Sequence, residues 1–107
     1  MVPTATTIDE LEALIRQWGN DRNIINGSTV HAQIAKFCEE FGELVSAILR
    51  GDKPKIEDGF GDAIVVLIMM MAQTKCNMKD CMRAAYDEIK NRRGKMVDGV
   101  FVKESDL

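Results

Sequence analysis

The segment Ala63–Ala72, which reads AIVVLIMMMA, constrains the fold of this chain more than any other stretch. A helix that is apolar on every face has to be buried all round. The β-branched residues of the segment would also suit a buried strand, but its length and the helical pattern around it favour a helix. A chain of 107 residues has few other helices to cover it. We therefore expect a helix over about 56–75 that also forms a subunit interface.

Length and composition predict one globular domain over residues 1–107. Hydrophobic residues make up 46% of the chain, which argues against disorder. The net charge of −3 argues against a nucleic acid polymer as partner. The apolar segment is too short to span a bilayer, so no membrane association is expected.

The cysteines and the N-terminal sequence bear on the compartment. Cys38, Cys76 and Cys81 form no C-x-x-C pair, which is typical of reduced thiols. The N-terminal segment carries no basic stretch of the kind that opens a signal peptide. We therefore expect a cytoplasmic protein.

The first third of the chain predicts one helix followed by a loop. Thr7 and Glu10 have the spacing of a capping box, so a helix should follow Thr7 and run to about Trp18. The next stretch, GNDRNIINGS, is rich in glycine and asparagine and is predicted to be a loop.

A second helix is predicted from Ser28, its N-cap, to Gly51, which follows Arg50 as a C-terminal stop. The short connection GDKP should return the helix over 56–75 antiparallel to it. Its apolar residues recur at helical spacing and predict a core stripe: Ile34, Phe37, Phe41, Leu44, Val45 and Ile48.

The C-terminal third predicts a fourth helix and a hairpin. Asn77 reads as an N-cap and Gly94 as the residue that ends the helix. The Asp98-Gly99 pair between apolar runs is typical of a β-hairpin. The expected core seam of the fourth helix is Met78, Met82, Ala85 and Ile89. Together these features predict an all-α antiparallel bundle of about four helices with a short C-terminal β-hairpin.

Acidic residues gather beside the predicted core. At 100° per residue, Glu40 and Glu43 share one side of the second helix, whereas Glu39 points to solvent. Asp58 and Asp62 are one turn apart and share a face of the next helix. Antiparallel packing would bring the two pairs together, and a divalent cation relieves such repulsion. Carboxylate ligands select Mg²⁺, with Mn²⁺ as the alternative, and not Zn²⁺.

The fourth helix carries a basic line at spacings of four, three, four and three: Lys79, Arg83, Tyr86, Lys90 and Arg93. Carboxylates that face such a line would suit a metal-bound polyphosphate. Simpler interpretations remain open. Spaced glutamates are most often a solvated face, Glu40 can pair with Lys36, and Trp18 is more often a core lid than a stacking platform.

The sequences EEFGEL and DGFGDAIVVL resemble those of the MazG-like nucleotide pyrophosphohydrolases, small bacterial and phage type, in the all-α NTP pyrophosphatase superfamily. The family pattern is E-E-x-x-E followed by E-x-x-D. Glu39, Glu40 and Glu43 match its first half and Asp62 its last residue. The glutamate of E-x-x-D falls on Gly59. Either Asp58 substitutes for it, or the metal is held by fewer side chains and more water.

The resemblance implies Mg²⁺-dependent hydrolysis of an NTP or dNTP to the monophosphate and pyrophosphate, in a homodimer or homotetramer. It implies a catalytic set of Glu39, Glu40, Glu43 and Asp62, with Glu39 or Glu43 accepting the proton of water. The implied metal ligands are Glu40, Glu43 and Asp62, with Asp58 auxiliary. The implied substrate-binding residues are Lys36, Lys90 and Arg93 for the phosphates and Trp18 and Asn91 for the nucleoside.

Two other functions compete with this one. A helical module of the same descent could bind a nucleotide or a partner without cleaving it, and Gly59 favours that alternative. A structural dimerisation protein would carry the same acids as solvated surface.

Overall fold

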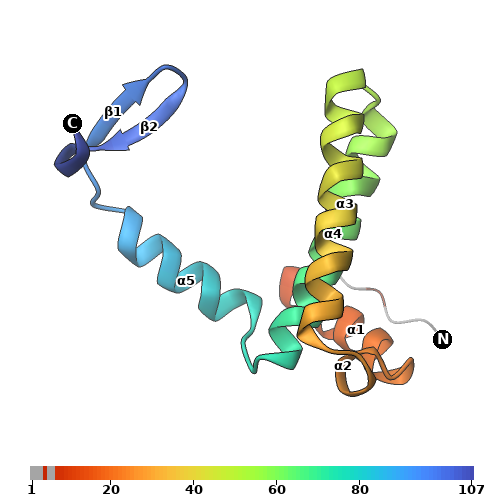
Figure 1. Cartoon of the computed structure of the whole chain (residues 1–107). Helices are drawn as coiled ribbons and strands as arrows, with labels where there is room; N and C mark the ends of the chain where they lie inside the picture. The colour runs from red at the N-terminus through yellow and green to blue at the C-terminus, as the bar shows by residue number, and fades with distance from the viewer. Residues whose placement is uncertain (1–3, 5–6) are drawn as a thin grey trace.

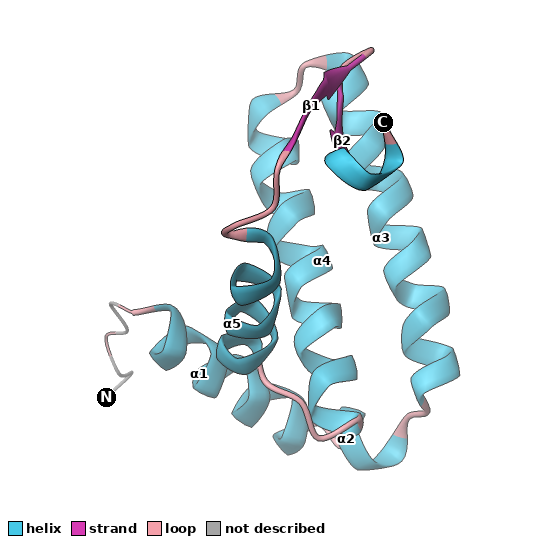
Figure 2. Cartoon of the chain, turned by 90° about the vertical axis from the view of Figure 1, so that its left-hand side faces the viewer, coloured by secondary structure: helices cyan, strands magenta, loops and turns pink. Residues whose placement is uncertain are grey.

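The computed structural model describes residues 4 and 7–107 of the chain. The described part contains four long helices and a terminal hairpin, which confirms the predicted all-α class (Figures 1 and 2). The helices are α1 (Ile8–Asp21), α2 (Ile24–Gly27), α3 (Val30–Arg50), α4 (Lys53–Gln73) and α5 (Met78–Ile89). The strands are β1 (Gly94–Val97) and β2 (Val100–Lys103), and a 3₁₀ turn, η1, spans Glu104–Asp106.

Helices α3 and α4 form an antiparallel pair, as the short connection between them predicted (Figure 2). Gly51 ends α3 in the left-handed conformation, at φ 69°, which confirms its predicted role. Asp52 then accepts a hydrogen bond from the Lys55 backbone N–H and caps α4. Because of this cap, and with Pro54 in the first turn, α4 begins slightly earlier than predicted.

The N-terminal third contains more helix than predicted. The Thr7 hydroxyl accepts a hydrogen bond from the Glu10 N–H, which confirms the capping box. Helix α1 continues past Trp18 to Asp21. The expected loop contains α2, whose first turn is closed by a hydrogen bond from the Gly27 N–H to the Asn23 carbonyl. The prediction of a continuous loop was therefore wrong.

Two predicted helix ends also differ from the structure. The N-cap of α3 is Thr29, not Ser28, and its hydroxyl accepts a hydrogen bond from the Ala32 N–H at 3.1 Å. Asn77 caps α5 as predicted. Gly94, however, belongs to β1 and does not end the helix. A Cβ there would overlap the Val102 carbonyl oxygen, so glycine serves the close approach of the two strands.

The hairpin prediction is confirmed. Val97 pairs with Val100 across a two-residue turn. Asp98 and Gly99 occupy that turn with φ angles of 51° and 84°. Two successive positive φ values define the primed turn that matches the twist of paired strands.

The buried core is small and lies where α3 meets α4 and where α1 and α2 cover the end of α4. Its apolar members are Leu44, Ala47, Ala63, Val66, Ile68 and Met69. Several residues of the predicted core are instead exposed by 38–61%: Ile34, Phe41, Val45 and Ile48 on α3, Ile64 on α4, and Met82 and Ile89 on α5. The prediction was wrong for them within one chain because α5 does not fold back onto the pair (Figure 1).

No single helix within the described residues is both long enough and apolar enough to cross a membrane. Helices α4 and α5 meet that test only when taken together, and a bend of 97° separates them.

Candidate active site

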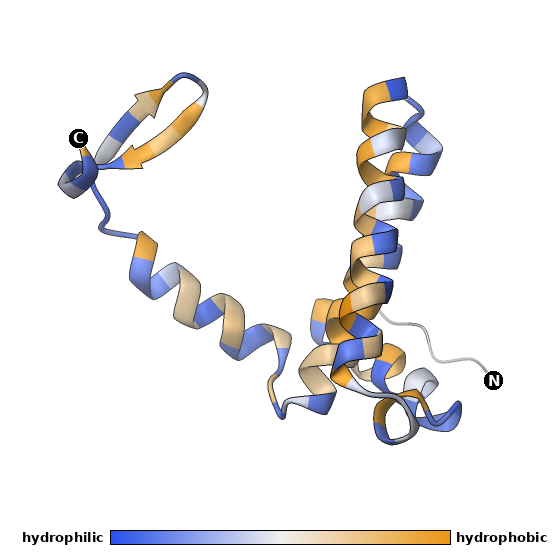
Figure 3. Cartoon of the chain, in the orientation of Figure 1, coloured by the Kyte–Doolittle hydropathy of each residue, from blue (hydrophilic) through white to orange (hydrophobic). Residues whose placement is uncertain are grey.

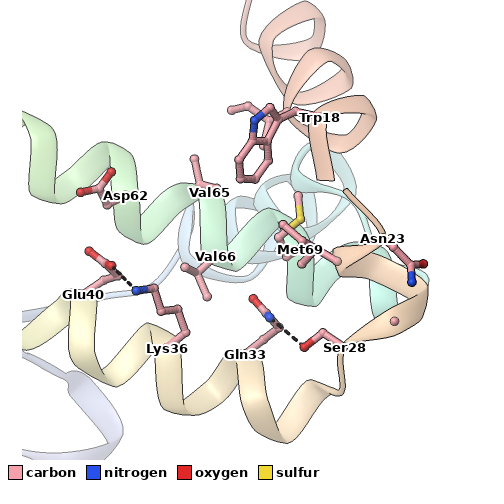
Figure 4. A pocket seen from close by; sticks show the side chains of 13 residues that line it. Trp18, Asn23, Ser28, Gln33, Lys36, Glu40, Asp62, Val65, Val66 and Met69 are labelled. Atoms are coloured by element: carbon pink, nitrogen blue, oxygen red, sulfur yellow. Dashed lines mark hydrogen bonds and ion pairs between the residues drawn. The ribbon is translucent and has the colours of Figure 1, made fainter. Parts of the chain in front are cut away.

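A large cavity of about 800 Å³ lies between the α3–α4 pair and the N-terminal helices α1 and α2 (Figure 4). Trp18 of α1 forms one wall, and Val65, Val66 and Met69 of α4 form another. Its polar residues are Asn23, Ser28, Gln33, Lys36, Glu40 and Asp62. The charged residues lie toward one end and the amides toward the other, so the cavity has a charged end and a neutral end.

A second cavity of about 430 Å³ continues along the same side of the pair, and we call it the acidic groove. Glu43 borders it from α3, and Asp58 and Asp62 border it from α4. Asp62 lines both cavities, so the groove and the charged end of the large cavity adjoin. As predicted, the acidic residues of the two helices gather on one side of the pair.

Glu40 is the most buried of these carboxylates, with 9% of its surface exposed. Its Oε1 lies 3.2 Å from Lys36 Nζ, and the same ammonium lies 3.5 Å from Glu39 Oε1. The hydrogen bond to Glu40 raises the pKa of Lys36, and the negative charges of Glu39 and Glu40 raise it further. The pairing of Glu40 with Lys36 is therefore present, and it places a positive charge at the cavity.

The carboxylates do not form a compact ligand set. Within residues 4 and 7–107, no three His, Cys, Asp or Glu side chains lie close enough to hold a metal ion. The Glu40 carboxylate is directed to Lys36 instead (Figure 4). The donor chemistry nevertheless fits Mg²⁺, because the residues that border the charged end supply only carboxylate oxygens as anionic donors.

Gly59 is a packing residue. It is buried where α4 crosses α3, and a Cβ there would lie 3.1–3.3 Å from Leu44 atoms, including its Cα. A glutamate at this position could not enter without moving α3. Asp58, one residue earlier, is exposed and borders the acidic groove. The sequence thus carries its acid at position 58, where there is room, and a glycine where the two helices touch.

The predicted substrate-binding residues fall into two groups. Trp18 and Lys36 line the large cavity. Lys90, Asn91 and Arg93 follow α5, beyond the 97° bend, and Lys90 pairs with Asp87 at 3.2 Å. The prediction that the basic line faces the acidic residues was therefore wrong within one chain, because α5 leads away from them (Figure 1).

Sequence reasoning missed three polar residues of the neutral end: Asn23, Ser28 and Gln33. Gln33 Nε2 donates a hydrogen bond to Ser28 Oγ at 3.0 Å. The signal was available for Gln33, since it lies on the same helical line as Lys36 and Glu40. Trp18 is 42% exposed, so it is a wall of the cavity rather than the core lid considered above.

The fold and the site together define an all-α protein with an acidic site on a helical pair beside a ligand-sized cavity. The sequence model of the family described as "MazG nucleotide pyrophosphohydrolase domain" matches residues 28–97. This match covers more than half of the chain and includes all five acidic residues discussed above. The chain therefore belongs to the MazG nucleotide pyrophosphohydrolase family.

One curated relative is an uncharacterized 18.2 kDa protein from the rep-hol intergenic region of Haemophilus phage HP1 (strain HP1c1). It is 38% identical over 66 residues, which is 62% of this chain and 40% of the relative. The chain thus spans about two fifths of that relative's length. No solved structure matches the chain.

Proposed function

We propose that this protein hydrolyses a nucleoside triphosphate, NTP or dNTP, to the monophosphate and pyrophosphate with Mg²⁺, for which Mn²⁺ could substitute. The observation that carries the proposal is the large cavity, with carboxylates and an ammonium at one end and an indole and amides at the other. Its volume of about 800 Å³ is within the range of small-molecule sites.

The cavity suggests how a nucleotide would lie. The nucleoside would occupy the neutral end, with its base beside the Trp18 ring and within reach of Gln33. The phosphates would extend past Lys36 toward the acidic groove. The Lys36 ammonium, whose pKa is raised by the hydrogen bond to Glu40, stays charged at neutral pH and offsets phosphate charge.

Glu40, Glu43 and Asp62 would hold the Mg²⁺ ion, with Asp58 as auxiliary ligand. When bound, the ion supplies charge neutralisation for the phosphates and lowers the pKa of a coordinated water. Glu39 and Glu43 are the candidate proton acceptors. Glu43 borders the acidic groove, whereas Glu39 borders neither cavity and pairs with Lys36, so we assign the role to Glu43.

The reaction balances as a simple hydrolysis. Water adds to the α-phosphorus, the bond from that phosphorus to the bridging oxygen breaks, and pyrophosphate leaves with the bonding electron pair. The proton of the water passes to the Glu43 carboxylate. Lys36 stays in place as a fixed positive charge throughout, so it lowers the energy of the charged transition state without a reorganisation cost.

We also propose a homodimer or homotetramer assembled through the exposed apolar side of the α3–α4 pair. Phe41, Ile48 and Phe60 expose 47–53% of their surface there. Such a patch on a soluble protein is typical of a subunit interface. The proposed setting is the cytoplasm, with a nucleotide as ligand and neither a nucleic acid polymer nor a membrane as partner.

The test is pyrophosphate release from a panel of NTPs and dNTPs with Mg²⁺. Combined Glu40→Gln and Asp62→Asn changes should lower kcat/KM more than about 100-fold, since they remove two of the three proposed Mg²⁺ ligands. Glu57→Gln is the matched control, because Glu57 pairs with Lys53 away from both cavities, and it should leave the rate unchanged. Equal release from the wild type and the double variant would overturn the proposal.

The second candidate is a non-catalytic module that binds nucleotides, and the packing of Gly59 against Leu44 favours it because a family carboxylate is missing there. Calorimetry separates the two functions. Mg²⁺-dependent binding of a nucleotide without turnover would support the binding module and exclude the enzyme.

A further inference from the structure

Trp18 is the single tryptophan of the chain, and it forms the wall of the large cavity on the side of α1. Its side chain reaches from α1 toward Val65 and Met69 of α4 (Figure 4). The residue is nevertheless 42% exposed, so packing alone does not enclose the ring. An exposed side chain changes rotamer rapidly unless another group holds it. What holds this ring therefore decides how well the cavity is formed before a ligand arrives.

The backbone of Trp18 is fixed by the residue that follows it. Gly19 is buried, and a Cβ at this position would overlap the Sδ atom of Met69. Met69 is itself only 2% exposed, so it has no space into which to retreat. The glycine lets α1 approach α4 closely at this point. This contact holds the Cα atom of Trp18 in place but leaves the orientation of its ring open.

Arg22, one helical turn after Trp18, covers the ring. Its Cζ atom lies over the indole at 4.7 Å from the ring centroid, within the range of a cation–π contact. Its Nη1 atom also donates a hydrogen bond to the Trp18 carbonyl oxygen at 3.2 Å. The guanidinium is thus bound both to the ring and to the backbone of the same residue, which fixes the one relative to the other.

No carboxylate competes with the indole for this guanidinium. The ion pairs found among residues 4 and 7–107 do not include Arg22. The carboxylate of the preceding residue, Asp21, accepts a hydrogen bond from Gln17 Nε2 at 2.7 Å instead. The surroundings, residues 20–23, are hydrophilic and exposed (Figure 3). The contact with the indole is therefore the main interaction that orders the Arg22 side chain.

The guanidinium lies outside the cavity. Trp18 is one of the residues that line the described cavity, whereas Arg22 is not. The ring therefore stands between the guanidinium and the cavity. The charged end of the cavity is formed by Lys36, Glu40 and Asp62, away from this wall (Figure 4). Arg22 is thus placed to act on the ring and not on the phosphates of a nucleotide.

We propose that Arg22 is a positioning residue for the nucleobase: it holds the Trp18 ring from outside the cavity, so that the ring is ready to stack on the base. This inference rests on the proposed function, because it needs a nucleotide in the cavity. A ring that is already ordered loses less conformational entropy when the ligand binds. Since every base has a π face, the gain in affinity applies to all bases. Arg22 strengthens binding through the base without contacting the ligand.

The first experiment needs no ligand, because the fluorescence of the single tryptophan reports on this ring alone. Arg22→Ala should lower the fluorescence anisotropy and raise the rate constant of quenching by acrylamide at least about twofold. Arg22→Lys keeps a cation and should restore most of the wild-type value. Lys53→Ala is the control, because Lys53 pairs with Glu57 away from the cavity. Equal quenching in the wild type and in Arg22→Ala would overturn the proposal.

The second experiment measures binding by calorimetry, in the presence of Mg²⁺, with two kinds of probe. The α,β-methylene analogues of the dNTPs carry a base and resist cleavage at that bond, whereas inorganic tripolyphosphate has no base. Arg22→Ala should weaken binding of the analogues about three- to tenfold and leave tripolyphosphate binding unchanged. In a Trp18→Leu background it should have no further effect, because Arg22 acts through the ring. Equal weakening of both probes, or a full effect without Trp18, would overturn the proposal.

Turnover separates this inference from the proposed function. In an active enzyme, Arg22→Ala should raise KM about three- to tenfold and leave kcat within about twofold of the wild type. Analogue binding that depends on Arg22, without any hydrolysis of dNTPs, would support the role of Arg22 and reject the enzyme. Hydrolysis with the same KM in the wild type and in Arg22→Ala would reject the role of Arg22 and leave the enzyme. A wild type that binds no nucleotide would reject both.

Discussion

The α3–α4 pair and the C-terminal arm, residues 78–107, contain similar apolar side chains, but only the pair packs within its own chain. Ile68 of α4 is 1% exposed, whereas Ile89 of α5 is 52% exposed. Both residues lie at positions where the sequence predicts a buried face. The difference shows that an amphipathic pattern predicts a helix and its apolar face, but not whether the rest of the chain covers that face.

The largest expected effect comes from changing the buried isoleucine of α4 to alanine. Ile68→Ala should lower the free energy of unfolding by about 2–5 kcal/mol, because it leaves a cavity in a closed core. The loss should be the same at every protein concentration. Thermal or denaturant unfolding at several concentrations measures it.

Ile89→Ala is the matched change in the arm. In a monomer it should have almost no effect, because the side chain is already half in water. If the arm packs against a second copy in the proposed oligomer, Ile89→Ala should instead weaken assembly, so that the midpoint of unfolding depends more steeply on protein concentration. A large, concentration-independent loss for Ile89→Ala would contradict the contrast between the two regions.

The next effect concerns the joint between the two regions. Glu12→Ala leaves the Met78 N–H without its partner and removes the ion pair with Arg16. Because the carboxylate is buried, the expected cost is about 1–3 kcal/mol, and the Met78 amide should exchange its hydrogen faster. NMR or mass spectrometry measures the exchange rate of the Met78 amide hydrogen, with Asp9→Ala as the control variant. Unchanged protection at the base of α5 would show that Glu12 does not hold the arm.

Two glycines of α4 sharpen the description of the pair. A Cβ added at Gly61 would have no atom within 4 Å, so Gly61→Ala should stabilise the helix by about 0.5–1 kcal/mol. A Cβ added at Gly59 would lie only 3.1–3.3 Å from Leu44 atoms. Gly59→Ala should therefore cancel that gain and lower the free energy of unfolding by about 1 kcal/mol. Denaturant unfolding compares the two variants. Equal stabilisation by both would mean that α3 yields easily at this crossing and that position 59 has room for a side chain.

The fold could be predicted from the sequence wherever a local rule decides it. Thr7, Asn77 and Gly51 were assigned correctly because caps act within a few residues of chain. Gly94 was assigned wrongly because its role depends on close contacts with Val102 and Phe101 of the paired strand. The local pattern that marks helix ends carries no information on those contacts. The exposure of Phe41 and Met82 was missed for a related reason, since burial depends on which segments meet.

The site could be predicted in part. Helical phase placed Glu40 near the core and grouped Glu43, Asp58 and Asp62 on one side of the pair. It did not reveal the neutral end of the cavity, where Gln33 bonds Ser28, because two segments create that end and polar residues carry no periodic signal. Nor did it show that Lys90 follows a helix that leaves the bundle.

The smallest expected effect tests the charged end of the cavity through Lys36. Its pKa is raised above the ordinary 10.5, first by the hydrogen bond to Glu40 and then by the charges of Glu39 and Glu40. A raised lysine pKa adds stability below pH 10.5 that is lost as the pH rises through the folded pKa. Glu40→Gln should lower the pKa toward 10.5, and Glu39→Gln should lower it less, because only the charge and a weaker hydrogen bond are removed.

NMR titration of the Lys36 side chain measures this pKa directly, and alkaline unfolding curves should show a smaller loss above pH 10.5 for Glu40→Gln than for the wild type. A larger fall for Glu39→Gln than for Glu40→Gln would mean that the ammonium turns outward to solvent. Lys36 would then not offset charge in the cavity. The positive charge at the phosphates would have to come from another part of the protein, so this measurement tests the role proposed for Lys36.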